Sequence, residues 1–241
     1  MNRDNQSARR QSRRDVMVAF ATFAVGLAVM FVAWGGVGDP WRSLLYHFIF
    51  GLGVCVMFPT WYVVATGRSL EDMGLSLDQL GRNVLVGVIA ACVTVPWRLG
   101  GSHLPELRSL ATLIAAMCFS TLFEEVFFRG FLQTRVEAVM GLVPAVAVSS
   151  LAFALYHLGY GGEWRHLESM IRMTLVGVMF GAVFRLTKNV ATSFLLNLPH
   201  AVVTFLERQE FFSDRAAITS IVVVVLAGLW MRKLARVVSV K

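Results

Sequence analysis

Two adjacent glutamates interrupt a long apolar stretch of the chain. Glu124 and Glu125 follow fifteen uncharged residues, 109–123, and the chain is again mostly apolar after Arg129. At the centre of a bilayer an ionised carboxylate costs about 2.5–3.5 kcal/mol on insertion scales, so a carboxylate at that depth usually pairs, performs chemistry, or does both. This stretch is therefore the first candidate site.

The spacing gives the two carboxylates different surroundings. Glu125 and Arg129 are four residues apart, so they share one face of a helix and can pair. Because successive helical residues turn by about 100°, Glu124 points away from that pair and is left to meet another helix. A structural ion pair near a helix end, with the second glutamate reaching the membrane interface, explains the same spacing without chemistry.

Polar residues in two later apolar segments could join the glutamates. Phe153 and His157 share a helix face, as do Asn197 and His200, and Pro199 can open a polar pocket in a membrane helix. A carboxylate in an apolar site can act as a general base on water, and a histidine can assist it or protonate a leaving nitrogen. An amide or imidazole donor can stabilise an oxyanion. The pattern indicates a hydrolase site inside a helix bundle.

Simpler interpretations of these residues remain. His157 could lie at the membrane interface, and Asn197 could serve a helix–helix hydrogen bond. Two histidines with one or two carboxylates would suffice in number for zinc, but no His-Glu-x-x-His run is present. We therefore expect no cofactor, with zinc as the less favoured alternative. Three cysteines in apolar runs show no metal-type spacing and predict packing residues rather than disulfides: Cys55, Cys92 and Cys118.

The composition is that of an integral membrane protein. Of 241 residues, 56% are hydrophobic and 15% charged, against about 25% charged in a soluble domain. The net charge of +7 does not indicate nucleic-acid binding, because the basic residues lie at helix ends and in the N-terminal tail, where they set topology and contact anionic lipid. The bilayer is thus the expected partner.

The apolar runs predict an all-α, polytopic membrane bundle of about eight transmembrane helices. They cover about 16–34, 44–66, 83–97, 106–135, 139–158, 167–186, 189–206 and 216–231. The first run holds 19 uncharged residues, more than the 7–15 typical of a cleaved signal, so it predicts a retained helix after a basic cytoplasmic tail, 1–15. We expect a single transmembrane domain over 16–236, a catalytic core at about 105–207, and a tail over 237–241.

Eight passes place both termini on one side of the membrane. With that topology, fifteen Lys and Arg residues fall on the side of the termini and seven on the other side. The positive-inside rule then predicts cytoplasmic termini. The compact size and the eight spans suit a bacterial plasma membrane.

The combined motifs resemble a known family of intramembrane proteases. The residues that carry the resemblance are Glu124-Glu125-x-x-x-Arg129-Gly130, Phe153-x-x-x-His157, Phe180-Gly181 and Thr187-Lys188-Asn189, where lysine replaces the family's glycine. They are similar to those of the CAAX-processing and bacteriocin-processing proteases, the CPBP or Abi family, which includes the Rce1-type CAAX prenyl endopeptidases. The resemblance covers about 107–206.

The resemblance implies roles for individual residues. Glu124 matches the glutamate that activates water, Glu125 and Arg129 match its supporting pair, and His157 matches the second catalytic residue. The fourth motif departs from the family, because Asn197 stands where a histidine is usual and Ala201 where asparagine or aspartate is usual. His200 lies one turn further on. Asparagine is a poorer zinc ligand, which weakens a metal mechanism and leaves an altered or inactive site open.

The resulting hypothesis is an intramembrane endopeptidase of glutamic type that acts on a membrane-associated peptide or protein. In it Glu124, oriented beside the catalytic His157, activates water, the Glu125–Arg129 pair fixes the helix and biases protonation, and Asn197 with His200 steadies the oxyanion. A non-catalytic membrane immunity or scaffold protein that binds a partner is the main alternative. A proton-coupled transporter is a third, against which the sequence shows neither repeat symmetry nor paired broken helices. No residue implies that the substrate is prenylated.

Overall fold

The computed structural model describes residues 3–96, 105–208 and 212–239, and every regular element in these ranges is a helix. Seven helices are long and apolar enough to cross a membrane, and a shorter apolar helix, Leu80–Thr94, accompanies them within the described ranges. This confirms the predicted all-α polytopic helix bundle; the third of the about eight predicted spans is the short helix Leu80–Thr94. The spans are Arg10–Trp34, Trp41–Ala65, Leu107–Met140, Leu142–Tyr160, Leu167–Thr187, Val190–Arg208 and Asp214–Ala235.

Several spans combine more than one helical element. In chain order the elements are α1 (Arg3–Trp34), α2 (Trp41–Ser43), the π-helix η1 (Leu44–Met57), α3 (Phe58–Ala65), the 3₁₀ turn η2 (Leu70–Met73), α4 (Leu80–Thr94), α6 (Leu107–Glu124), the π-helix η3 (Glu125–Gln133), α7 (Thr134–Met140), α8 (Leu142–His157), the 3₁₀ turns η4 (Leu158–Tyr160) and η5 (Gly162–Arg165), α9 (Leu167–Thr187), α10 (Val190–Arg208) and α11 (Asp214–Ser239).

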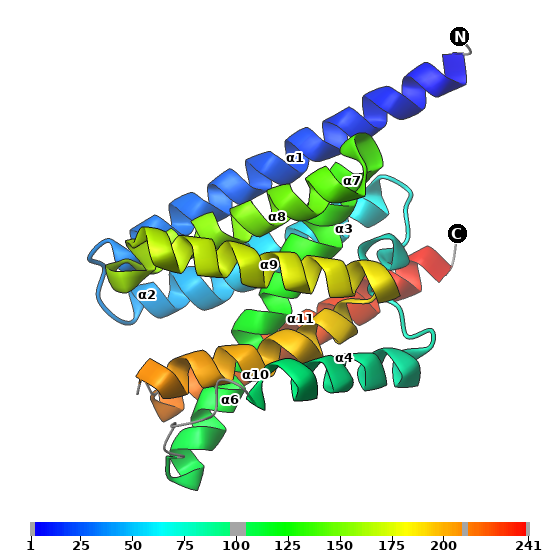
Figure 1. Cartoon of the computed structure of the whole chain (residues 1–241). Coiled ribbons are helices and arrows are strands. Elements are labelled where there is room, and N and C mark those ends of the chain that lie inside the picture. The colour runs from blue at the N-terminus through cyan, green and yellow to red at the C-terminus, as the bar shows by residue number, and fades with distance from the viewer. Residues whose placement is uncertain (1–2, 97–104, 209–211, 240–241) are drawn as a thin grey trace.

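The helices run back and forth, and the bundle has two distinct ends (Figure 1). Both chain termini lie at one end, which we call the terminal end; it also holds the α3–α4 connection and the α7–α8 and α9–α10 turns. The opposite end, the far end, holds the α1–α2, α8–α9 and α10–α11 connections. Helix α6 crosses the others obliquely (Figure 1), and it ends at Glu124, where η3 continues the span with Glu125.

Two helix boundaries differ from the sequence prediction. The first helix begins at Arg3 rather than near residue 16, because no glycine or proline interrupts the basic segment. Buried Asp15 holds the turn of α1 that precedes the apolar run. Its carboxylate accepts hydrogen bonds from Gln11 (3.0 Å), Tyr62 (2.8 Å) and Arg68. The fourth predicted helix runs on to Met140 and changes to π-type hydrogen bonding at Glu125. Part of the third predicted helix, Trp97, lies outside the described residues.

Small residues let helix α9 lie close to its neighbours. A Cβ atom placed on Gly177 would lie 3.0 Å from Cα of Ser150 on α8, and one on Gly181 would lie 2.8 Å from Oε1 of Gln133 on η3. Backbones that approach this closely gain van der Waals contact that lipid cannot replace. The Gly177-x-x-x-Gly181 pattern thus positions α9 against the helix that carries the glutamates.

We predict that Gly177→Val destabilises the protein by about 1–3 kcal/mol, because the added atoms overpack a backbone contact. Gly228→Val on α11 is the matched control, since a Cβ atom there meets nothing within 4 Å. Thermal unfolding of the purified protein in detergent measures both. Equal melting temperatures for the two variants would contradict the close α8–α9 contact.

Candidate active site

The two glutamates lie where helix α6 changes into the π-helix η3. Glu124 is the last residue of α6 and Glu125 the first of η3, and all nine residues of η3 are buried. Glu125 is fully buried, whereas Glu124 keeps 7% of its surface exposed. Since π-type turns occur often at functional sites, the change of helix type agrees with the choice of this stretch as a site.

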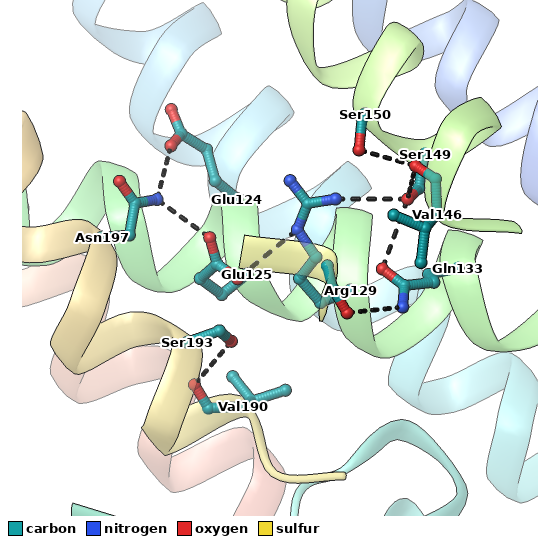
Figure 2. A network of polar contacts seen from close by, with 11 residues as sticks. Glu124, Glu125, Arg129, Gln133, Val146, Ser149, Ser150, Val190, Ser193 and Asn197 are labelled. Carbon is teal, nitrogen blue, oxygen red and sulfur yellow. Dashed lines mark hydrogen bonds and ion pairs between the residues drawn. The ribbon is translucent and has the colours of Figure 1, made fainter. Parts of the chain in front are cut away.

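One amide group on α10 holds both carboxylates (Figure 2). Nδ2 of Asn197 donates to Oε1 of Glu125 at 2.9 Å and to Oε2 of Glu124 at 3.3 Å. The amide nitrogen carries two hydrogens, so both are used in these contacts. A rotation of about 100° per residue predicts that the two glutamate side chains point in different directions. In the structure their carboxylates converge, because both reach Asn197 on α10.

The predicted Glu125–Arg129 pair is present and fully buried. Nε of Arg129 lies 3.7 Å from Oε2 of Glu125, and the guanidinium group lies over the Phe153 ring at 5.4 Å. Nη1 of Arg129 donates to Oγ of Ser149 on α8 at 3.2 Å. Within the described residues, Nε and Nη2 have no hydrogen-bond acceptor, so the link to Glu125 is chiefly Coulombic.

A polar chain continues from Arg129 to helix α9. Oγ of Ser149 lies 3.3 Å from Oε1 of Gln133, and Nε2 of Gln133 donates to the carbonyl oxygen of Gly181 at 3.1 Å. Sequence reasoning did not select Ser149 or Gln133. The available signal was their spacing, since Gln133 follows Arg129 by four residues and Ser149 precedes Phe153 by four.

His157 lies at the end of α8 in an aromatic environment. Its Nδ1 is 2.7 Å from the carbonyl oxygen of Phe153, which can only accept, so Nδ1 carries the hydrogen and Nε2 is the basic nitrogen. The imidazole ring centre lies 4.6 Å from that of Phe153, 4.8 Å from that of Tyr156 and 5.0 Å from that of Trp164. These rings restrict the imidazole to one orientation.

His200 is tied to the short helix α4. Its Nε2 lies 2.8 Å from Oγ1 of Thr94, whose hydroxyl hydrogen is donated to the carbonyl oxygen of Ala90 at 2.8 Å. Because that hydroxyl has one hydrogen, Nε2 of His200 must be the donor toward Thr94. The tautomer of His200 is thereby fixed from outside the glutamate cluster.

A cavity of about 1760 Å³ connects the candidate residues. Its walls include Glu124, His157, Asn197 and His200, whereas Glu125 and Arg129 lie behind Glu124 and do not line it. The structure thus brings together all six residues selected from the sequence, four on the cavity and two in support. Three tyrosines that sequence reasoning missed also meet here: Tyr46 and Tyr160 join their hydroxyl groups at 3.0 Å, and Tyr160 also hydrogen-bonds Tyr156. They come from two helices, so no single segment reveals them.

The described residues offer no cluster of metal ligands. Over residues 3–96, 105–208 and 212–239, no three His, Cys, Asp or Glu side chains are arranged to hold one. The residues present therefore do not form a zinc site of the expected kind, and we derive no step through a metal. The expectation that the protein needs no cofactor stays a prediction.

Comparison with known families agrees with the motifs. Residues 106–206 match the family model described as type II CAAX prenyl endopeptidase Rce1-like, and this segment contains all six candidate residues. The resemblance to the Rce1 type of the CPBP proteases is therefore confirmed. No curated protein matches the chain. The family match supports a function of the CAAX-protease type and implies an intramembrane protease.

We predict that Arg129→Met destabilises the protein by about 3–5 kcal/mol, because it leaves the buried Glu125 without its cation. Glu125→Gln combined with Arg129→Met is expected to recover part of this loss, since no unpaired charge then remains. Unfolding in detergent of both single variants and the double variant gives the coupling energy. Strictly additive losses would argue against a direct pair.

A second prediction concerns the Asn197 amide. Asn197→Asp places a third carboxyl group beside Glu124 and Glu125, so we expect a larger loss of stability than for Asn197→Leu, which has similar volume and no charge. The same unfolding measurement ranks the two variants. If Asn197→Asp were the milder change, the amide nitrogen would not face the glutamates.

Proposed function

We propose that this protein is an intramembrane endopeptidase of glutamic type, in which Glu124 activates water to hydrolyse a peptide bond of a membrane-associated polypeptide. One observation carries the proposal: a buried carboxylate, Glu124, lies on the wall of a large cavity that also reaches His157 and His200. A carboxylate at membrane depth with access to a cavity is a functional group by default.

In this mechanism Glu124 is the general base. It takes a proton from water as the water oxygen bonds to the substrate carbonyl carbon, and the proton passes to the nitrogen as the carbon–nitrogen bond breaks. Nε2 of His157 supplies a second basic position on the cavity, because Nδ1 is committed to Phe153. Water, carboxyl product and amine product balance without a further reactant.

The supporting residues hold Glu124 in place. The amide of Asn197 fixes Glu124 relative to Glu125, and Arg129 compensates one of the two negative charges. Both amide hydrogens of Asn197 contact the glutamates, so stabilisation of an oxyanion by this group requires release of the longer contact, to Glu124. His200 lies on the same cavity and is the second candidate for that task, which requires protonation of its Nδ1 or release of its contact with Thr94.

The proposal also covers the domain organisation of the protein and its orientation in the membrane. We propose a single transmembrane domain over 16–236 whose catalytic core, 105–207, contributes every candidate residue, and an orientation with both termini in the cytoplasm of a bacterial cell. The location of both termini at one end of the bundle supports the shared side. The excess of basic residues at that end supports the cytoplasm.

We predict that Glu124→Gln lowers kcat/KM by about 10²–10⁴-fold, the range that general-base catalysis contributes. Glu71→Gln, at an exposed position in the α3–α4 connection, is the control and should leave activity unchanged. The assay uses purified protein and a panel of tagged membrane-peptide substrates, with and without a zinc chelator. Activity that survives the chelator and is lost in Glu124→Gln supports the glutamic type, and activity lost with the chelator points to a metal.

A complementation test separates the enzyme from a binding protein. If Glu124→Gln and His157→Ala both retained full cellular function, the non-catalytic scaffold would replace the protease as the better explanation. His157→Ala is expected to reduce activity in the peptide assay as well, because it removes the second basic group from the cavity.

A further inference from the structure

The cavity that reaches Glu124 extends toward one end of the bundle. Besides residues within the helices, its walls include residues at or next to the connections of the far end: Trp34, Asp39, Pro40, Gly161–Trp164 and Phe212–Ala216. Figure 1 shows these connections opposite the chain termini. The entrance to the site therefore lies at the far end.

The terminal side of the glutamates is filled by protein. Arg129 and Gln133 are fully buried there, and neither lines the cavity. The segment that follows η2 lies against η3, where a Cβ atom on Gly130 would be only 2.7 Å from the carbonyl oxygen of Met73. The next residue, Gly74, accepts a hydrogen bond from the amide of Val190 at 2.9 Å. Among the described residues, packed side chains and backbone thus occupy the terminal side of Glu124.

The two ends differ sharply in basic residues. When the buried Arg129 is set aside, fourteen Lys and Arg residues belong by sequence position to the terminal end and seven to the far end. Five of the fourteen precede the first span: Arg3, Arg9, Arg10, Arg13 and Arg14. Positive residues near short loops and membrane ends are retained in the cytoplasm, so this distribution places the far end outside.

We propose that the active-site cavity opens on the extracytoplasmic face of the membrane, and that the substrate is a segment of an exported or membrane-anchored polypeptide on that face. The inference rests on the proposed protease function and deepens it by naming a substrate class. It differs from what the family description suggests, because a prenylated C-terminal tail is held in the cytoplasmic leaflet, on the other side of the bundle.

The cavity wall fits a segment that adjoins a membrane anchor. Leu44 on η1 and Ile218 and Val222 on α11 line the cavity and are also 41%, 62% and 45% exposed on the surface of the bundle. Because these apolar side chains lie both on the cavity wall and on the outer surface of the bundle, the cavity is continuous with the lipid. A polypeptide can therefore keep its anchor in the bilayer while its adjoining segment enters the site.

Two glycines provide a matched test of sidedness that needs no activity. Gly38 lies in the far-end connection before α2, and Gly81 lies in the first turn of α4 at the terminal end. Both are exposed, and a Cβ atom on either meets nothing within 4 Å, so Gly38→Cys and Gly81→Cys should fold alike. The parent chain measures the labelling of Cys55, Cys92 and Cys118, of which Cys92 is exposed, and this background is subtracted.

A charged, membrane-impermeant maleimide is applied to spheroplasts before and after detergent. We expect Gly38→Cys to be labelled in intact spheroplasts and Gly81→Cys only after detergent. The reverse pattern, or labelling of both variants before detergent, would overturn the proposal. Either result is independent of whether the protein cleaves anything.

A second measurement tests the substrate class. Two single-span substrates with the same cleavable segment, placed outside in one and in the cytoplasm in the other, are each co-expressed with wild type and with Glu124→Gln. We expect wild type to cleave only the outside segment and Glu124→Gln to cleave neither. Cleavage of the cytoplasmic segment alone would refute the assigned face. If labelling met expectation and neither segment were cut, the protease function would fail and the sidedness would stand.

Discussion

Glu125 and Arg129 form an ion pair between two fully buried side chains, and the packing of the neighbouring helices around η3 depends on it. Taking two such charges out of water costs several kcal/mol for each ion, so the pair persists only if neighbouring groups compensate it. Those groups come from three other helices: Asn197 on α10 holds Glu125, Ser149 on α8 contacts Arg129, and Gln133 carries the chain to Gly181 on α9. One buried pair thus defines how three helices meet η3.

The same contacts explain why the helix that carries the glutamates is not uniform. The change from α6 to η3 occurs between Glu124 and Glu125, which places one carboxylate on the cavity and the other behind it. A polar network in a low-dielectric interior specifies a unique packing only when most of its members are satisfied. Here most of the hydrogen bonds are made by Asn197 and Ser149. Helix α9 completes the network because Gly181, which has no side chain, lets it approach Gln133 closely.

Sequence reasoning reached the helices and the six candidate residues because both signals are local. Apolar runs of sufficient length identify spans, and polar residues four apart in such runs identify shared faces. The π-helix escaped prediction because a shift of hydrogen bonding by one residue leaves the apolar pattern unchanged. The direction of the Asn197 amide and the meeting of Tyr46 with Tyr156 and Tyr160 depend on how separate helices pack, so no spacing within one segment encodes them.

The charge balance of the site connects its structure to its proposed chemistry. Two carboxylates share one guanidinium group, and Asn197 contributes hydrogen bonds but no charge. One negative charge is therefore left for Glu124, the carboxylate that lines the cavity. In the proposed mechanism Glu124 takes a proton from water while the hydroxide equivalent bonds to the substrate carbonyl carbon, so the negative charge passes from Glu124 to the oxyanion. In this mechanism Asn197 holds the general base in place. His200 can donate to the oxyanion only when Nδ1 is protonated or when the contact with Thr94 is released, because Thr94 already accepts the Nε2 hydrogen.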